Sequence, residues 1–167
     1  KNNNISIYAV AWALENYKFS PFISKAQKSI SFINQAQLCI EESNLKEVLP
    51  LINGVFLARD LINLPANLIN PEKIEEISFE VAKFHNAEIK IIKGEKLKKN
   101  FPAIYTVGRA AEESPRLIDL HLLKDKKFPK ITLVGKGVTF DSGGLDLKPT
   151  KAMELMKKDM GGAAIAM

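Results

Sequence analysis

The feature that most constrains the fold of this chain is a short apolar run that ends at a lysine between two glycines. Residues 131–134 read Ile-Thr-Leu-Val and lead directly into Gly135-Lys136-Gly137. This pattern predicts a buried strand that runs into a loop. Because ligands usually bind beyond the strand ends of open α/β sheets, chemistry is expected in the residues that follow.

Four charged side chains stand out in the glycine-containing stretch 135–162, namely Lys136, Asp141, Lys148 and Asp159. Buried charges are costly unless they are paired or bound to a metal. The stretch therefore indicates either a divalent-metal or oxyanion site, or a structural loop held by ion pairs. It fits neither common glycine-rich phosphate motif, and Asp141 would repel a phosphate that lacked a metal.

The two lysines allow different roles. Lys136 can be a metal ligand only as a neutral amine, because an ammonium has no lone pair. Otherwise we expect it to pair with Asp141. Lys148 can stay charged and face an oxyanion. Asp159 precedes Gly161-Gly162 and the apolar run 163–167, which predicts a helix start whose positive field keeps the carboxylate ionised.

The remaining pattern predicts alternating helices and strands. Helices are expected over 5–18, 43–63 (with Pro50 in the first turn), 71–85 after a turn-rich joint at 64–71, and 95–101. Strands are expected over 28–33, 36–40, 87–94, 103–108 and 116–123. This order predicts an α/β fold, a sheet with helices on both faces.

Composition narrows the class of protein further. The chain has 167 residues, 46% of them hydrophobic, which suffices for a core, and no apolar run long enough for a membrane span. The net charge of +5 comes from dispersed lysines, which favours a solvated surface over a nucleic-acid interface. The single cysteine, Cys39, excludes an internal disulfide, and its apolar neighbours predict a buried side chain.

The segments VGKGVTFDSGG, LKP and MELMKKDMGGAA together closely resemble the signature of the leucyl aminopeptidase family, the cytosol aminopeptidases with two metal ions. The match is ungapped, with spacings of five, seven and eleven residues between the four charged side chains. Weaker similarity covers RDLINLPANLINPEKI and FPAIYTVGRAAEESPRLIDL. The resemblance thus extends over nearly the whole chain.

The resemblance implies a role for each matched residue. Lys136, through its neutral amine, and Asp159 would bind the tighter-held metal, and Asp141 would contact both metals. Lys148 would be the catalytic lysine that polarises the scissile carbonyl and stabilises the gem-diolate. Met156 would line the pocket for the side chain of the substrate's N-terminal residue.

The resemblance also implies cofactors and partners. The cofactors would be two divalent ions, Zn²⁺ or Mn²⁺ with Co²⁺ or Mg²⁺ as substitutes, and a bicarbonate held by an arginine. The substrates would be peptides that lose an N-terminal leucine or another apolar residue. We expect a cytoplasmic homohexamer with no membrane or nucleic-acid partner.

The family's later ligand segment, Asn-Thr-Asp-Ala-Glu-Gly-Arg, does not occur in this sequence. We therefore expect an internal piece of a longer enzyme that is inactive alone. Residues 1–40 would be the end of a smaller N-terminal α/β domain, and 41–66 would be a linking helix. Residues 67–167 would be the first portion of the catalytic metallopeptidase domain, a mixed-sheet α/β domain with helices on both faces. The alternative is a catalytically inactive family member that acts as a binding or DNA-binding regulatory protein.

Overall fold

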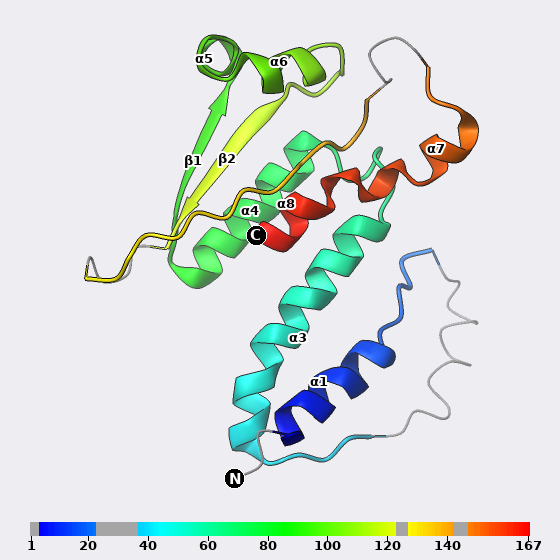
Figure 1. Ribbon diagram of the computed structural model, residues 1–167, viewed down its shortest axis with the longest axis vertical. Coiled ribbons are helices and arrows are strands. Elements are labelled where there is room, and N and C mark those ends of the chain that lie inside the picture. The colour runs from blue at the N-terminus through cyan, green and yellow to red at the C-terminus, as the bar shows by residue number, and fades with distance from the viewer. Residues whose placement is uncertain (1–3, 23–36, 123–126, 142–146) are drawn as a thin grey trace. The chain divides into compact units, whose positions relative to one another are not determined.

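A computed structural model describes residues 4–22, 37–122, 127–141 and 147–167 of the chain (Figure 1). The chain divides into two compact units, Lys1–Asp60 and Leu61–Met167. The division falls inside the long helix α3 (Glu42–Asn63). Among the described residues, no helix is long and apolar enough to cross a membrane.

The first unit is built from helix α1 (Asn4–Glu15) and most of α3, which confirms the helices expected at 5–18 and 43–63. Ala9 packs against Val48 and Ile52 in a small core. The prediction that Pro50 marks the first turn of its helix is wrong, because α3 begins eight positions earlier, at Glu42. Val48 and Ile52, on either side of the proline, are buried. Their packing stabilises a continuous helix, although Pro50 lacks the backbone N–H that a helical hydrogen bond needs.

Side-chain hydrogen bonds and a cation–π contact join the end of α1 and the residues after it to the later turns of α3. The Tyr17 hydroxyl donates to Asp60 Oδ1 at 2.6 Å, and Arg59 Nη1 donates to the Leu14 carbonyl at 2.8 Å. Arg59 also lies over the Tyr17 ring, 5.2 Å from its centroid. The centroid of the Tyr17 ring lies 5.1 Å from that of Phe56, which packs against the small core, so these contacts continue from that core.

The strand expected at 28–33 lies outside the described residues. Of the strand expected at 36–40, residues 37–40 are described and have no regular structure. Cys39 is exposed there, so the prediction that it is buried is wrong. An apolar triplet alone does not bury a cysteine, since residues 37–40, as far as the structure describes this segment, have no regular structure.

The second unit contains helix α4 (Pro71–His85) and two strands, which confirms the helix expected at 71–85 and the strands expected at 87–94 and 116–123, and the two strands pair antiparallel. Asn70 caps α4 by accepting from the Lys73 N–H at 2.8 Å, and Asn86 ends it in a left-handed conformation with φ 51°. One face of α4 is buried, at Ile74, Ser78 and Ala82. This spacing of four residues places all three on the same side of the helix.

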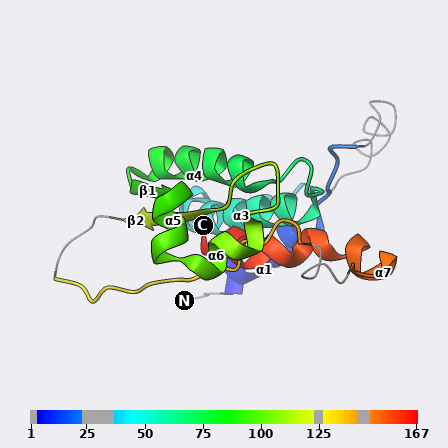
Figure 2. The same cartoon turned by 90° about the horizontal axis from the view of Figure 1, so that it is seen from above.

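Strand β1 (Glu88–Lys93) pairs with β2 (Arg116–His121) in a register that aligns Glu88 with His121 and Lys93 with Arg116. Helix α4 packs against both strands and lies along one side of them (Figure 2). The nearly buried Arg116 guanidinium forms an ion pair with Glu75 of α4, which ties helix to sheet. The α/β fold class is thus confirmed, and the described part of the sheet has two strands.

Two short helices, α5 (Gly94–Asn100) and α6 (Pro102–Gly108), connect β1 to β2. The helix expected at 95–101 is confirmed, but the strand expected at 103–108 is wrong. Pro102 has the fixed φ that favours a first helical turn, and the Tyr105 N–H donates to the Phe101 carbonyl at 3.2 Å. Ala103, Tyr105 and Val107 alternate as in a strand, whereas Ile104 and Val107, three residues apart, lie on one side of the observed helix.

The buried strand expected at 131–134 is also wrong. The described segment 127–141 contains no strand, and Ile131, Leu133 and Val134 are 81%, 72% and 92% exposed. A strand needs a neighbour that satisfies its backbone groups. In the described sheet, β1 and β2 pair with each other and not with this run.

The end of the chain is helical. Helix α7 (Thr150–Glu154) is followed by the 3₁₀ helix η1 (Met156–Met160) and then by α8 (Gly161–Ala166). The helix expected near Gly161-Gly162 is confirmed, and it begins at Gly161 itself. The buried Ser78 hydroxyl of α4 lies 3.4 Å from the sulfur of Met167, just after α8, so this end of the chain packs against α4.

Candidate functional site

Lys136 and Asp159 are brought together by close packing of the main chain around two glycines. The Ala163 N–H donates to the Lys136 carbonyl at 2.8 Å. A Cβ built on Gly162 would lie 2.7 Å from the Lys136 nitrogen, and one on Gly135 would lie 2.6 Å from the Ala163 Cα. Since real Cβ atoms do not approach the main chain so closely, glycine is required at both positions.

Two lysines flank the Asp159 carboxylate. The Lys136 Nζ lies 3.6 Å from Oδ2, and the Lys158 Nζ lies 3.1 Å from Oδ1. The hydrogen bond from Lys158 lowers the pKa of Asp159 below its usual value, and the charges of Lys136, Lys158 and Lys148 act in the same direction, against the opposing effect of partial burial. Asp159 therefore presents an ionised carboxylate, as a metal ligand must.

Lys148 is held between a carboxylate and a sulfur. Its Nζ lies 2.6 Å from Asp141 Oδ1 and 3.6 Å from the Met156 sulfur. The side chains of Lys148 and Asp141 are each 26% exposed, and Met156 is buried. The Lys136–Asp141 pair that the sequence left open does not form, because Lys136 pairs with Asp159 instead.

The five residues singled out in the sequence form two contact groups, Lys136 with Asp159 and Lys148 with Asp141 and Met156, which are together called the cluster below. The charge of Lys148 also acts on Asp159. The cluster offers two carboxylates and the amine of Lys136, and such oxygen and nitrogen donors fit a divalent cation of borderline hardness. Among the described residues, no group of three or more His, Cys, Asp or Glu is placed to hold a metal ion.

Lys158 and the end of α3 lie beside this cluster, although the sequence pattern did not indicate it. Lys158 contacts Asp159, and its place beside Asp159 in the sequence was the available signal. A Cβ built on Gly161 would lie 3.2 Å from the side chain of Ile62. The Oδ1 atom of Asn63 lies 3.5 Å from the Lys157 Nζ. These two contacts join residues about a hundred positions apart, which no local pattern predicts.

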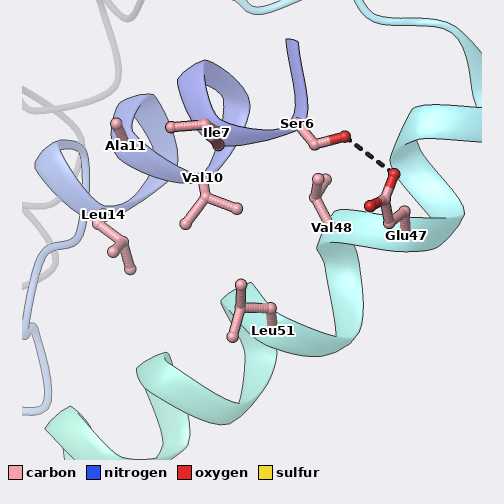
Figure 3. Close-up of a pocket in the computed structure, with 8 residues that line it drawn as sticks. All are labelled: Ser6, Ile7, Val10, Ala11, Leu14, Glu47, Val48 and Leu51. Carbon is pink, nitrogen blue, oxygen red and sulfur yellow. Dashed lines mark hydrogen bonds between the residues drawn. The ribbon is translucent and has the colours of Figure 1, made fainter. Parts of the chain in front are cut away.

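A separate groove of about 560 Å³ lies in the first unit, between α1 and α3 (Figure 3). Its lining is mostly apolar and includes Val10, Leu14 and Leu51. At one end the Ser6 hydroxyl donates to Glu47 at 2.9 Å. None of the residues singled out in the sequence lines this groove.

The fold and the charged cluster agree with a class of α/β peptidases, and comparison with known proteins gives the family. Residues 56–167 match the catalytic domain of the cytosol aminopeptidase family. This match covers more than half of the chain. The chain therefore belongs to the cytosol aminopeptidase family, as the signature residues led us to expect.

Individual relatives support the assignment to this family. A probable cytosol aminopeptidase of Legionella pneumophila (strain Paris) is 40% identical over 125 residues, covering 74% of this chain and 26% of the relative. The crystal structure of the cytosol aminopeptidase from Coxiella burnetii matches with a TM-score of 0.87 and 43% identity, over 97% of this chain and 34% of that one.

The bottromycin maturation enzyme BotP, solved in complex with Mn, matches with a TM-score of 0.73 and 31% identity, over 95% of this chain and 33% of its own. The chain thus spans about a quarter to a third of the length of these relatives.

Proposed function

We propose that the protein is a metal-dependent aminopeptidase that releases leucine and other apolar residues from the N-termini of peptides. The observation that carries this proposal is the cluster in which Lys136 meets Asp159 while Lys148 meets Asp141. The family to which the chain belongs supports the activity. Neither the described residues nor the comparisons favour the alternative of an inactive, DNA-binding regulator.

Each residue of the cluster has a role in this proposal. Asp159 and the neutral amine of Lys136 would hold one divalent ion, and Asp141 would supply a carboxylate to the proposed pair of ions. When bound, the ions would supply an acidified water and polarise the scissile carbonyl. Zn²⁺ and Mn²⁺ are the ions proposed, with bicarbonate as a further cofactor, and the Mn present in the related BotP structure supports manganese.

Lys148 is the proposed catalytic lysine. Its ammonium donates to the carbonyl oxygen of the substrate as negative charge develops there. In the structure, this ammonium lies 2.6 Å from Asp141 Oδ1 and 3.6 Å from the Met156 sulfur, and both contacts support a donor that is positioned before substrate arrives. Met156 is buried beside it and is proposed to contact the side chain of the N-terminal residue.

The proposed domain arrangement follows the sequence argument. In this proposal, an N-terminal domain ends with residues 1–40, a linking helix covers residues 41–66, and the first portion of the catalytic domain covers residues 67–167. The division of the chain at Asp60 and the family match from residue 56 support a boundary near the end of α3. We also propose a cytoplasmic location, supported by the names of the relatives.

Metal removal tests the proposed activity. Exhaustive chelation of the complete protein should abolish hydrolysis of leucine p-nitroanilide, and added Mn²⁺ or Zn²⁺ should restore it, because acidified water and a polarised carbonyl both require the ions. The release of nitroaniline by absorbance is the measurement, and a mock-dialysed sample is the control. Full activity in protein shown by elemental analysis to hold no metal would refute the proposal.

A further inference from the structure

Lys158 contacts the proposed metal site but has no role in the proposed chemistry. Its Nζ lies 3.1 Å from Asp159 Oδ1, while Lys136 lies 3.6 Å from Oδ2. Each oxygen of Asp159 therefore has a lysine neighbour. An ammonium has three donors and no lone pair, so Lys158 in its charged form competes for the carboxylate and cannot join it in binding a metal.

Among the described residues of the cluster, Lys158 is the cation in excess of the carboxylates. Two carboxylates, Asp141 and Asp159, are matched by Lys148 and Lys136 through the pairs described above. Lys158 adds a third positive charge on the same carboxylate as Lys136. A divalent cation that binds Asp159 would meet this charge at close range, and like charges at such distances repel.

We propose that Lys158 is an internal competitor for the metal, which occupies Asp159 in the metal-free protein and weakens divalent-cation binding at this site. The inference rests on the proposed function, since it concerns the same site. The Lys158 side chain is 63% exposed, so it can swing into solvent when a metal displaces it. The Asp159 side chain is only 18% exposed and stays in place.

The size of the effect is limited by the same exposure. Ion pairs of exposed lysines are weak and are screened by salt, so removing Lys158 should tighten metal binding by about two- to fivefold. Lys157 provides a matched control. It is the adjacent lysine on η1, but its Nζ lies 3.5 Å from Asn63 Oδ1.

The experiment is a calorimetric titration of MnCl₂ into the metal-stripped complete protein, for the wild type, Lys158→Gln, Lys158→Arg and Lys157→Gln. We expect Lys158→Gln to lower the Kd for Mn²⁺ by about two- to fivefold in low salt, and by less in 0.5 M KCl, because salt screens the lysine. Lys158→Arg keeps the charge and should retain the wild-type Kd. Lys157→Gln should also leave it unchanged.

Two failures are distinguishable. If the wild type binds Mn²⁺ but Lys158→Gln has the same Kd, or if Lys157→Gln gains as much, the inference about Lys158 is overturned and the proposed metal site stands. If Mn²⁺ binding to the wild type is absent, or is unaffected by Asp159→Asn, the proposed function fails and the inference fails with it. Thermal melts of every variant confirm that each remains folded during the titration.

Discussion

Lys136 and Lys148 have the same side chain but different surroundings. Lys136 is 61% exposed and reaches Asp159 at 3.6 Å, whereas Lys148 is 26% exposed and reaches Asp141 at 2.6 Å. The loosely held lysine can reorganise around an ion, as a ligand must. The tightly held lysine suits a donor whose position is fixed before the reaction, because preorganised donors stabilise developing charge best.

Substitution of the two lysines should therefore have different effects. Lys136→Arg, which is always charged and offers no lone pair, should lower metal occupancy together with activity. Lys148→Ala should leave both metals bound while kcat falls by roughly 10²–10³, the usual loss for one such donor. Elemental analysis of the purified complete variants, beside kcat for a leucine anilide, is the measurement.

Lys151→Ala is the control for these variants, because Lys151 is an exposed lysine of the nearby helix α7. It should keep both metal content and kcat. Our division of roles would be contradicted if Lys148→Ala lost as much metal as Lys136→Arg, or if Lys136→Arg retained both ions.

At the scale of elements, the segment around Lys136 and the start of α8 are joined by main-chain atoms. Gly162→Ala would place a Cβ 2.7 Å from the Lys136 nitrogen, so one of the two segments must shift. We expect a loss of about 1–3 kcal/mol in the free energy of unfolding, the usual cost of overpacking. Urea denaturation of the complete protein is the measurement.

Gly137→Ala is the matched control, since its Cβ would meet only the Ala163 side chain, at 3.4 Å. It should change the unfolding free energy by much less than Gly162→Ala. Equal stability of Gly162→Ala and the wild type would mean that this main-chain contact does not hold the segments together.

The elements that the sequence predicted correctly are those whose signals are local. Asn70 and Pro71 begin α4 through cap and first-turn chemistry that needs only neighbouring residues. Residues 103–108 show that alternation of apolar residues does not suffice to predict a strand. Pro102 favours a first helical turn, and these residues form a helix. The exposed run 131–134 failed as a strand because pairing depends on a second strand, which an apolar pattern cannot specify.

The candidate site shows the same division between local and distant information. The chemistry of Lys136, Asp141, Lys148 and Asp159 was visible in the sequence as charges at fixed spacings. Which amine meets which carboxylate was not, because it depends on the contact between residues 135–137 and the start of α8. Lys158 was overlooked because lysines on helix surfaces are usually solvated.

At the scale of the whole molecule, the chain accounts for 26% to 34% of the length of the relatives compared above. Assembly and activity are therefore properties to be tested on the complete protein. The active sites of a closed oligomer that face a shared interior would admit only short or unfolded peptides. Such an arrangement would favour peptides over folded proteins as substrates.

We predict that the complete protein is a homohexamer, as the resemblance to its family implies. Light scattering coupled to size-exclusion chromatography should give a mass of six subunits that persists on dilution. The same run with a monomeric standard of similar subunit size is the control. A stable monomer at all concentrations would contradict the prediction.

Because Gly135 and Gly162 meet through main-chain atoms, the separation of Lys136 from Asp159 depends little on the identity of the side chains around them. Over long evolutionary times, surrounding positions can change without moving one charged group relative to the other. At the two glycines, in contrast, the replacement of a hydrogen by a methyl group is already a large change. In related sequences, we thus expect many different residues at the positions that neighbour Gly135 and Gly162, and almost no replacement of the two glycines themselves.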